Sequence, residues 1–435
     1  MQRVAKFCKY LPSFGWEPVI LTVKDIEYLA RDESLAEEIP EEAKVFRSGS
    51  FDPLRVLFLL KKIFKRIRQR RIKTDQTNTE LYRTHTKKRA KCLSWFFFPD
   101  NKIGWFPWAL VKGYYLCKKE NIDLIFSTSP SPTAHLIAYC LKFLTKKRWV
   151  VDFRDPWVGY QYEHYPTFLH RSLKRKVETL ILTSADGIVT VNENIEKRIK
   201  EKNPWTEHLV TITNGFDTDD FVFASKGDPS GCPYKIIYMG TFNPDCNPEP
   251  FFKAWSNLLI KKELPNDKIR LIHLGLSIGL DIDGLLRKYD LTEAIERKGY
   301  LPHREALRIL IQADLLLLLV WEAEGTELTI PGKIYEYIYA QKPILALVPP
   351  EGAAASLIKQ FNAGQIIAPN DIIGIEKVLK SYYAEFESCR GLIYQARSGR
   401  INATPTISAK DLELFNRKHL TFNLAEFFNK IVEDK

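Results

Sequence analysis

The sequence lacks the features that mark membrane-spanning and disulfide-linked proteins. It has no uninterrupted apolar run of about 18 residues that could cross a bilayer, and no signal peptide opens the chain. Its seven cysteines show no C-x-x-C spacing, so neither a zinc site nor a disulfide framework is indicated. This odd, dispersed set fits a reducing compartment. We therefore expect a cytoplasmic protein that is soluble or peripheral on the inner membrane face.

The distribution of charge disfavours a nucleic-acid-binding class. The net charge is +11, but fourteen lysine and arginine residues stand against three acidic residues between Phe51 and Cys92, so the rest of the chain is neutral. No nucleic-acid reading motif accompanies this segment. Residues 54–71 have an amphipathic basic pattern, typical either of a helix in an anionic membrane interface or of an ordinary helix with a solvated charged face. The candidate membrane contacts are Lys61, Lys62, Lys65 and Arg66.

The order of the predicted elements indicates two domains. A chain of 435 residues with two successive runs of alternating strands and helices predicts an α/β protein with two Rossmann-like domains facing across a cleft. We expect one domain over 1–222, a linker within 224–233, a second domain over 233–407, and a helix over 408–435 that returns to the first. A strand should precede the helix predicted at 3–11, so either the chain is truncated or the sheet begins one strand short.

One stretch in the second half predicts a strand, a loop, a helix and a strand. Leu315 to Val320 is a continuous apolar run, typical of a parallel strand buried on both faces. Pro331 and Gly332 predict the start of a helix on which Lys333 and Glu336 lie three residues apart. A helix start at the carboxyl end of such a strand is where open α/β sheets bind phosphorylated ligands. Lys333 would meet phosphate and Glu336 a ribose diol, whereas a surface ion pair is the alternative interpretation.

A second group of charges follows the predicted strand at 149–153. Asp152, Arg154 and Asp155 come at its carboxyl end, where α/β enzymes place their chemistry. His135 lies on the first turn of the helix predicted at 133–144. The alternatives are an Arg–Asp pair that fastens the loop and a structural histidine.

The motifs occur in an order that resembles the family 4 glycosyltransferases of the GT-B fold. Asp152-Phe-Arg-Asp-Pro-Trp resembles the acceptor-side loop of a subgroup acting in cell-surface polysaccharide synthesis. Asn214-Gly-Phe-Asp is similar to the segment that leads into the interdomain crossover. Tyr238-Met-Gly-Thr resembles the opening of the donor domain, Gly299-Tyr-Leu-Pro its base-contacting loop, and Pro331-Gly-Lys-Ile-Tyr-Glu-Tyr its nucleotide-sugar helix.

This resemblance implies transfer of a sugar from a nucleotide-sugar donor to a lipid-linked or polysaccharide acceptor. It implies retention at the anomeric carbon, with no metal or other cofactor and no nucleic-acid partner. Helix N-terminal amides and cationic side chains would then stabilise the leaving diphosphate. The implied donor-binding residues are Gly240, Thr241, Gly299, Tyr300, Gly332, Lys333 and Glu336. The catalytic candidates are Arg154, Asp155, Asp152 and His135. The alternatives are a nucleotide-sugar epimerase and a non-catalytic or truncated GT-B protein in a polysaccharide assembly.

The sequence departs from the family pattern at three points. Where the family carries the first glutamate of its donor-site pair, this chain has Leu328, with Glu327 one place away. Residues 241–246 contain neither arginine nor lysine. The first strand and its glycine-rich loop would precede Met1. Binding of a donor with impaired turnover is therefore a second expectation.

Overall fold

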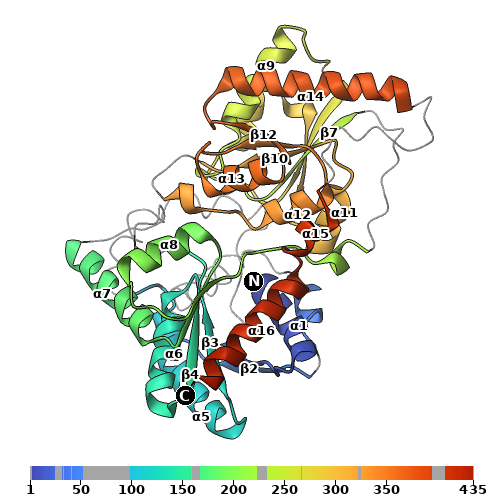
Figure 1. Ribbon diagram of the computed structural model, residues 1–435. Helices are drawn as coiled ribbons and strands as arrows, with labels where there is room; N and C mark the ends of the chain where they lie inside the picture. The colour runs from blue at the N-terminus through green and yellow to red at the C-terminus, as the bar shows by residue number, and fades with distance from the viewer. Residues whose placement is uncertain are drawn as a thin grey trace, which may run out of the picture. The chain divides into compact units, whose positions relative to one another are not determined.

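The computed structural model describes most of the chain (Figure 1). The described residues are 2–24, 32, 34–40, 42–51, 98–155, 157–158, 167–222, 233–265, 267–321, 325–393 and 407–434. The basic pattern at 54–71, with Lys61, Lys62, Lys65 and Arg66, lies outside them, as does nearly all of the predicted linker. The chain forms two compact units, which are described separately. The first contains Met1–Tyr10, Ala30–Ile39 and Thr213–Thr421, and the second Leu11–Leu29, Pro40–Ile212 and Phe422–Lys435.

The first unit is built on a six-stranded parallel sheet of order β12-β11-β10-β7-β8-β9. Its strands are β7 (Tyr234–Met239), β8 (Ile269–Leu274), β9 (Ile295–Gly299), β10 (Leu315–Leu319), β11 (Ile344–Leu347) and β12 (Gly364–Ile367). All five leucines of β10 are buried, which confirms the strand predicted there. Alternate leucines join different core clusters, Leu316 one and Leu317 the other, because successive side chains point to opposite faces of a sheet.

Helices lie on both faces of this sheet (Figure 1). The helices of this unit are α9 (Glu249–Ile260), α10 (Ile282–Lys288), α11 (His303–Leu310), α12 (Lys333–Ala340), α13 (Ala353–Gln360), α14 (Ile372–Ile393) and α15 (Ala409–Glu413). From the start of the chain, α1 (Gln2–Tyr10) and α2 (Ser34–Glu37) also belong to it. Gly279 has φ +75°, which a helix does not allow, and the Asp281 side chain caps α10 by accepting from the Gly284 N–H.

The second unit contains two parallel sheets. A pair is formed by β1 (Val19–Val23) and β2 (Lys44–Ser48). The other sheet has the order β3-β4-β5-β6, with β3 (Leu124–Thr128), β4 (Arg148–Phe153), β5 (Gly187–Thr190) and β6 (Leu209–Thr211). Its helices are α5 (Phe106–Lys119), α6 (Pro132–Thr145), α7 (Phe168–Ser184) and α8 (Glu193–Lys202), and α16 (Arg417–Glu433) runs from the first unit into this one.

The fold class predicted from the sequence is confirmed. Each unit has a parallel sheet whose strands alternate with helices along the chain, as in Rossmann-like domains. None of the helices in the described ranges is long and apolar enough to cross a membrane. The domain boundaries at 222 and 233 stay a prediction.

Candidate functional site

The predicted donor residues of the first unit lie at one edge of its sheet. Because all six strands are parallel, their carboxyl ends share that edge. Gly240 follows β7, Gly299 ends β9, and the loop after β10 leads to α12. Ligands of open α/β sheets bind in this position.

Lys333, the first residue of α12, is a partly buried cation. Its Nζ lies 4.1 Å from the centroid of the Tyr238 ring, a cation–π contact. Burial lowers the pKa of Lys333 to about 8. Within the described part of the chain, no carboxylate forms an ion pair with this ammonium group. An ammonium that lacks a counter-charge and lies at a helix N-terminus is suited to bind an anion.

Gly240 allows the backbone to pass close to this cation. A Cβ at Gly240 would lie 2.8 Å from Lys333 Nζ. The φ of Gly240 is +153°, which favours glycine at this position. The Gly240 carbonyl accepts a hydrogen bond of 2.8 Å from His273 Nε2–H. Burial, followed by the charge of Lys333, lowers the pKa of His273 to about 4, so its imidazole is neutral near pH 7. His273 thus holds the Gly240 loop in place.

Glu336 pairs with a histidine that the sequence analysis did not select. Its Oε1 lies 2.7 Å from His303 Nε2, and both side chains are buried. Burial acts to lower the pKa of His303, but Glu336 and then Asp220 raise it above the ordinary value. The alternative of a Lys333–Glu336 ion pair is therefore not what the structure shows. Glu336 is held by His303, and Lys333 is left for another partner.

The remaining donor candidates lie at the carboxyl ends of β7 and β9 and at the start of α12. The Tyr300 ring is 45% exposed, and a Cβ on the neighbouring Gly299, whose φ is +72°, would meet nothing within 4 Å. Gly332 is the exposed N-cap of α12. The Thr241 carbonyl accepts from the Tyr238 hydroxyl at 3.3 Å. An exposed tyrosine ring beside open backbone is compatible with stacking on a base.

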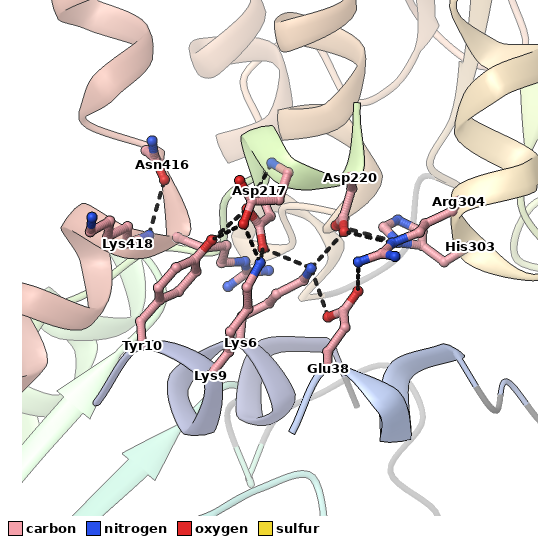
Figure 2. A network of polar contacts seen from close by, with 12 residues as sticks. Lys6, Lys9, Tyr10, Glu38, Asp217, Asp220, His303, Arg304, Asn416 and Lys418 are labelled. Carbon is pink, nitrogen blue, oxygen red and sulfur yellow. Dashed lines mark hydrogen bonds and ion pairs between the residues drawn. The ribbon is translucent and has the colours of Figure 1, made fainter. Parts of the chain in front are cut away.

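Sequence analysis missed a buried network of charges next to His303 (Figure 2). At its centre, Lys6 of α1 has Nζ 2.7 Å from Glu38 Oε2, 2.8 Å from Asp217 Oδ2 and 2.7 Å from Asp220 Oδ1. His303 Nδ1 is 3.6 Å from Asp220 Oδ2, so the network reaches Glu336 through His303. Further members are Lys9, Tyr10, Asp219 and Arg304.

Opposite charges in this network fix its protonation. Burial acts to lower the pKa of Lys6, but Asp220 and Asp217 raise it above the ordinary value. Burial acts in the opposite sense on Asp217, and Lys6 with Lys9 and Tyr10 lowers its pKa to about 2. Two signals in the sequence could have indicated the network: the acidic run 217–220, and two lysines three residues apart on α1.

In the second unit, Asp152 and Arg154 are fastened to the end of β3. Thr128 Oγ1 donates to Asp152 Oδ2 at 2.7 Å. The Arg154 backbone N–H donates to Ser129 Oγ at 2.8 Å, and its guanidinium donates to the Ser129 carbonyl at 3.2 Å. The neighbouring Asp155 is partly buried, and burial raises its pKa. The three charges therefore lie together at the carboxyl edge of this sheet.

His135 lies in the core of the second unit. Its ring has no exposed surface and stacks on Phe153 at 5.4 Å and Trp157 at 5.3 Å between ring centroids. Nδ1 is 2.8 Å from Ser127 Oγ, and burial lowers the pKa of the ring to about 3. A neutral, enclosed imidazole has no access to a substrate. This geometry corrects the prediction of a catalytic His135 and favours the structural alternative.

Comparison with known proteins gives one family match, over part of the chain. The model of Glycosyltransferase Family 4 matches residues 74–220. This part of the chain is therefore similar to the family 4 glycosyltransferases, which agrees with the resemblance drawn from the motifs. No curated protein matches the sequence.

Three solved structures show the same fold at low identity. Sucrose-phosphate synthase from Thermosynechococcus elongatus has a TM-score of 0.62 at 14% identity, over 98% of this chain and 92% of that chain. Anabaena HepE, in complex with UDP and glucose, has a TM-score of 0.62 at 11% identity, over 99% of this chain and 96% of that chain. The UDP-forming α,α-trehalose-phosphate synthase from Burkholderia xenovorans has a TM-score of 0.52 at 12% identity, over 73% of this chain and 77% of that chain. The likeness shows that the chain has the GT-B fold.

Proposed function

We propose that this glycosyltransferase takes its sugar from a nucleotide-sugar donor and retains the anomeric configuration. The carrying observation is Lys333, an ammonium group beside Gly240 that no carboxylate of the described residues pairs with. The UDP bound to Anabaena HepE and the UDP-forming reaction named for the trehalose-phosphate synthase support a nucleotide as the leaving group.

In this proposal the first turn of α12 receives the diphosphate. Lys333 and the positive end of the α12 dipole stabilise the negative charge that develops as the glycosidic bond breaks. Glu336 accepts from the ribose hydroxyls in an orientation that His303 fixes at 2.7 Å. Gly299 and Tyr300 border the base, and Gly240 with Thr241 leaves room for the sugar phosphate. The proposal includes no metal, because Lys333 and the helix N-terminus supply positive charge.

We assign the acceptor side to the carboxyl edge of β4. Arg154 would contact the transferred sugar and Asp155 the acceptor hydroxyl, while Asp152 holds the loop through Thr128. The raised pKa of Asp155 suits a carboxyl group that exchanges a proton with a hydroxyl. We further propose a lipid-linked or polysaccharide acceptor at the cytoplasmic face of the inner membrane, with Lys61, Lys62, Lys65 and Arg66 near the lipid.

A thermal-shift panel of UDP-, GDP- and ADP-glucose tests the donor. A ligand that binds only the folded state at a hundred times its Kd adds about 2.7 kcal/mol of stability. We expect one nucleotide class to raise the melting temperature, with or without a chelator, and Glu336→Ala to abolish this shift. Glu305→Ala is the matched control, because Glu305 is an exposed glutamate on α11. No shift with any nucleotide sugar would contradict the donor proposal. Release of an epimerised sugar would favour the epimerase alternative.

A further inference from the structure

Helix α5 of the second unit has an exposed face of unusual composition. Its buried side consists of Ala109, Gly113, Leu116 and Cys117, so the helix packs closely on α6 through small residues. On the other side, Trp108 is 55% exposed, Val111 73% and Tyr115 51%. These side chains alternate with lysines. The α5 face is defined here as Trp108, Val111, Lys112, Tyr115, Lys118 and Lys119.

The charge of the α5 face has one sign. No acidic residue occurs in α5, whereas three lysines do. Lys112 Nζ lies 5.4 Å from the Tyr115 ring centroid, and Lys119 Nζ lies 5.7 Å from it. Glu120, which follows the helix, is bound by Lys44 at 2.7 Å. The face therefore presents aromatic rings and ammonium groups side by side.

The end of the neighbouring helix extends this composition. At the C-terminus of α6, Phe143 is 67% and Leu144 50% exposed. Lys146 Nζ lies 4.7 Å from the Phe143 ring centroid. The α6–β4 connection contributes Lys147, which is close enough to Cys117 of α5 to act on its pKa. Two adjacent helices thus expose the same mixture of aromatic, aliphatic and basic side chains.

This mixture matches the chemistry of one partner, an anionic lipid surface. Tryptophan and tyrosine are enriched at the level of lipid head groups, where one end of the ring is apolar and the other is wet. Lysines on the same face are attracted to anionic lipids. An amphipathic helix with these two features lies in the plane of the interface. We propose that the α5 face docks this enzyme on an anionic membrane surface.

This inference extends the proposed membrane location to a described surface and does not depend on the donor. Co-sedimentation of the full chain with vesicles tests it. We expect binding to phosphatidylglycerol–phosphatidylcholine vesicles, weaker binding at high salt, and little binding to phosphatidylcholine alone. Lys112→Gln/Lys118→Gln/Lys119→Gln should weaken binding about fivefold per lysine. Trp108→Ser/Tyr115→Ser should weaken it without changing the charge.

Matched variants separate this surface from other causes. Lys253→Gln/Lys268→Gln/Lys377→Gln removes the same charge from exposed positions of the first unit and should leave binding unchanged. Donor-dependent thermal shifts of the α5 variants should equal those of the unsubstituted chain, which separates this inference from the proposed function and shows that the variants fold.

Three results would overturn the inference. Unchanged vesicle binding in both α5 variants would remove the α5 face from the membrane contact. Complete loss of binding with Lys61→Gln/Lys62→Gln/Lys65→Gln/Arg66→Gln, together with unchanged binding in the α5 variants, would assign docking to that segment. Self-association in light scattering that Trp108→Ser abolishes, without vesicle binding, would identify a second copy of the chain as the partner.

Discussion

Lys6, which is buried, and Lys333, which is partly buried, are two cations of the same unit with opposite surroundings. Lys6 is surrounded by Glu38, Asp217 and Asp220, all within 2.8 Å, and its pKa is raised. Lys333 lies over the Tyr238 ring without a carboxylate from the described residues, and burial lowers its pKa to about 8. A paired buried charge contributes to one folded arrangement, whereas an unpaired one is held ready for a ligand.

Of these two charges, that of Lys6 stabilises the fold and that of Lys333 is available for function. His303 lies between the two regions, because one ring nitrogen binds Glu336 and the other faces Asp220. Figure 2 shows His303 beside Asp220. Substitutions in the Lys6 network should therefore change stability most, and substitutions near Lys333 should change donor binding most. The following experiments either strengthen or remove this distinction.

Replacing Lys6 should have the largest effect. Lys6→Met leaves Glu38, Asp217 and Asp220 buried without their shared cation, which costs about 3–5 kcal/mol of unfolding free energy. Urea denaturation followed by tryptophan fluorescence measures the loss. Lys9→Met is the control and should cost about 1 kcal/mol, because the Lys9 side chain is 19% exposed. Equal losses of unfolding free energy in both variants would show that the burial of Lys6 does not make its ion pairs more stabilising than those of Lys9.

The second-largest effect should come from low pH, which weakens the ion pairs of the Lys6 network. Because the folded pKa of Asp217 is about 2, below its ordinary value of 3.8, its ionised form contributes stability above the ordinary pKa. That contribution, about 2 kcal/mol, is lost as the pH falls from about 4 through 2. Asp217→Asn should remove this part of the acid dependence in denaturation curves recorded across that range. An unchanged slope would mean that Asp217 is not held by Lys6.

Replacing His303 should affect donor binding moderately. His303→Asn removes a charged hydrogen bond to Glu336, which corresponds to about tenfold in the Kd of the donor. Because the His303 pKa is raised, the contribution of its charge is complete below the ordinary pKa and is lost as the pH rises through the folded value. The charged groups that act on this ring are Glu336, Asp220 and Lys6, and Arg304 contacts Asp220. Titration calorimetry with the donor should be repeated at pH values from below the ordinary histidine pKa to above the raised pKa of His303. The Kd of the donor should depend on pH for the unsubstituted chain and not for His303→Asn. The same profile in both would make His303 purely structural.

Replacing Lys333 should have the smallest effect on stability. Unlike the other substitutions, it should raise the unfolding free energy. Burial disfavours the charged amine, so Lys333→Met should raise the unfolding free energy by about 1 kcal/mol, a figure reduced because the side chain is partly exposed. The measurement is the same urea denaturation. A clear loss of stability would contradict the view that no carboxylate of the described residues pairs with Lys333.

The sequence predicted the local elements better than the contacts between them. Five successive leucines in β10 and the Pro331-Gly332 start of α12 are visible in the sequence because they depend on neighbouring residues. Lys6 and Asp220 are 214 positions apart, and periodicity carries no information about such a pair. In the helix predicted at 3–11, the apolar Phe7 and Cys8 are buried, but the charged Arg3 and Lys6 are buried too.

Candidate site residues show the same limit. Lys333 and Glu336 could be chosen from a motif, but only coordinates show that Glu336 pairs with His303. His135 was selected for its residue type, and its enclosure by Phe153 and Trp157 was not visible in the sequence. Arg154 was predicted at a strand end, whereas its hydrogen bonds to Ser129 depend on the adjacent strand.

Titration calorimetry with the nucleotide sugar that shifts the melting temperature tests the role of Lys333 most directly. We expect binding to the unsubstituted chain, weaker binding above about pH 8 as Lys333 loses its proton, and a loss of a hundredfold or more with Lys333→Met. Lys6→Arg, which keeps the charge of the network, should bind normally if it folds. Equal affinity of the unsubstituted chain and Lys333→Met would contradict the assignment of Lys333 to the donor phosphate.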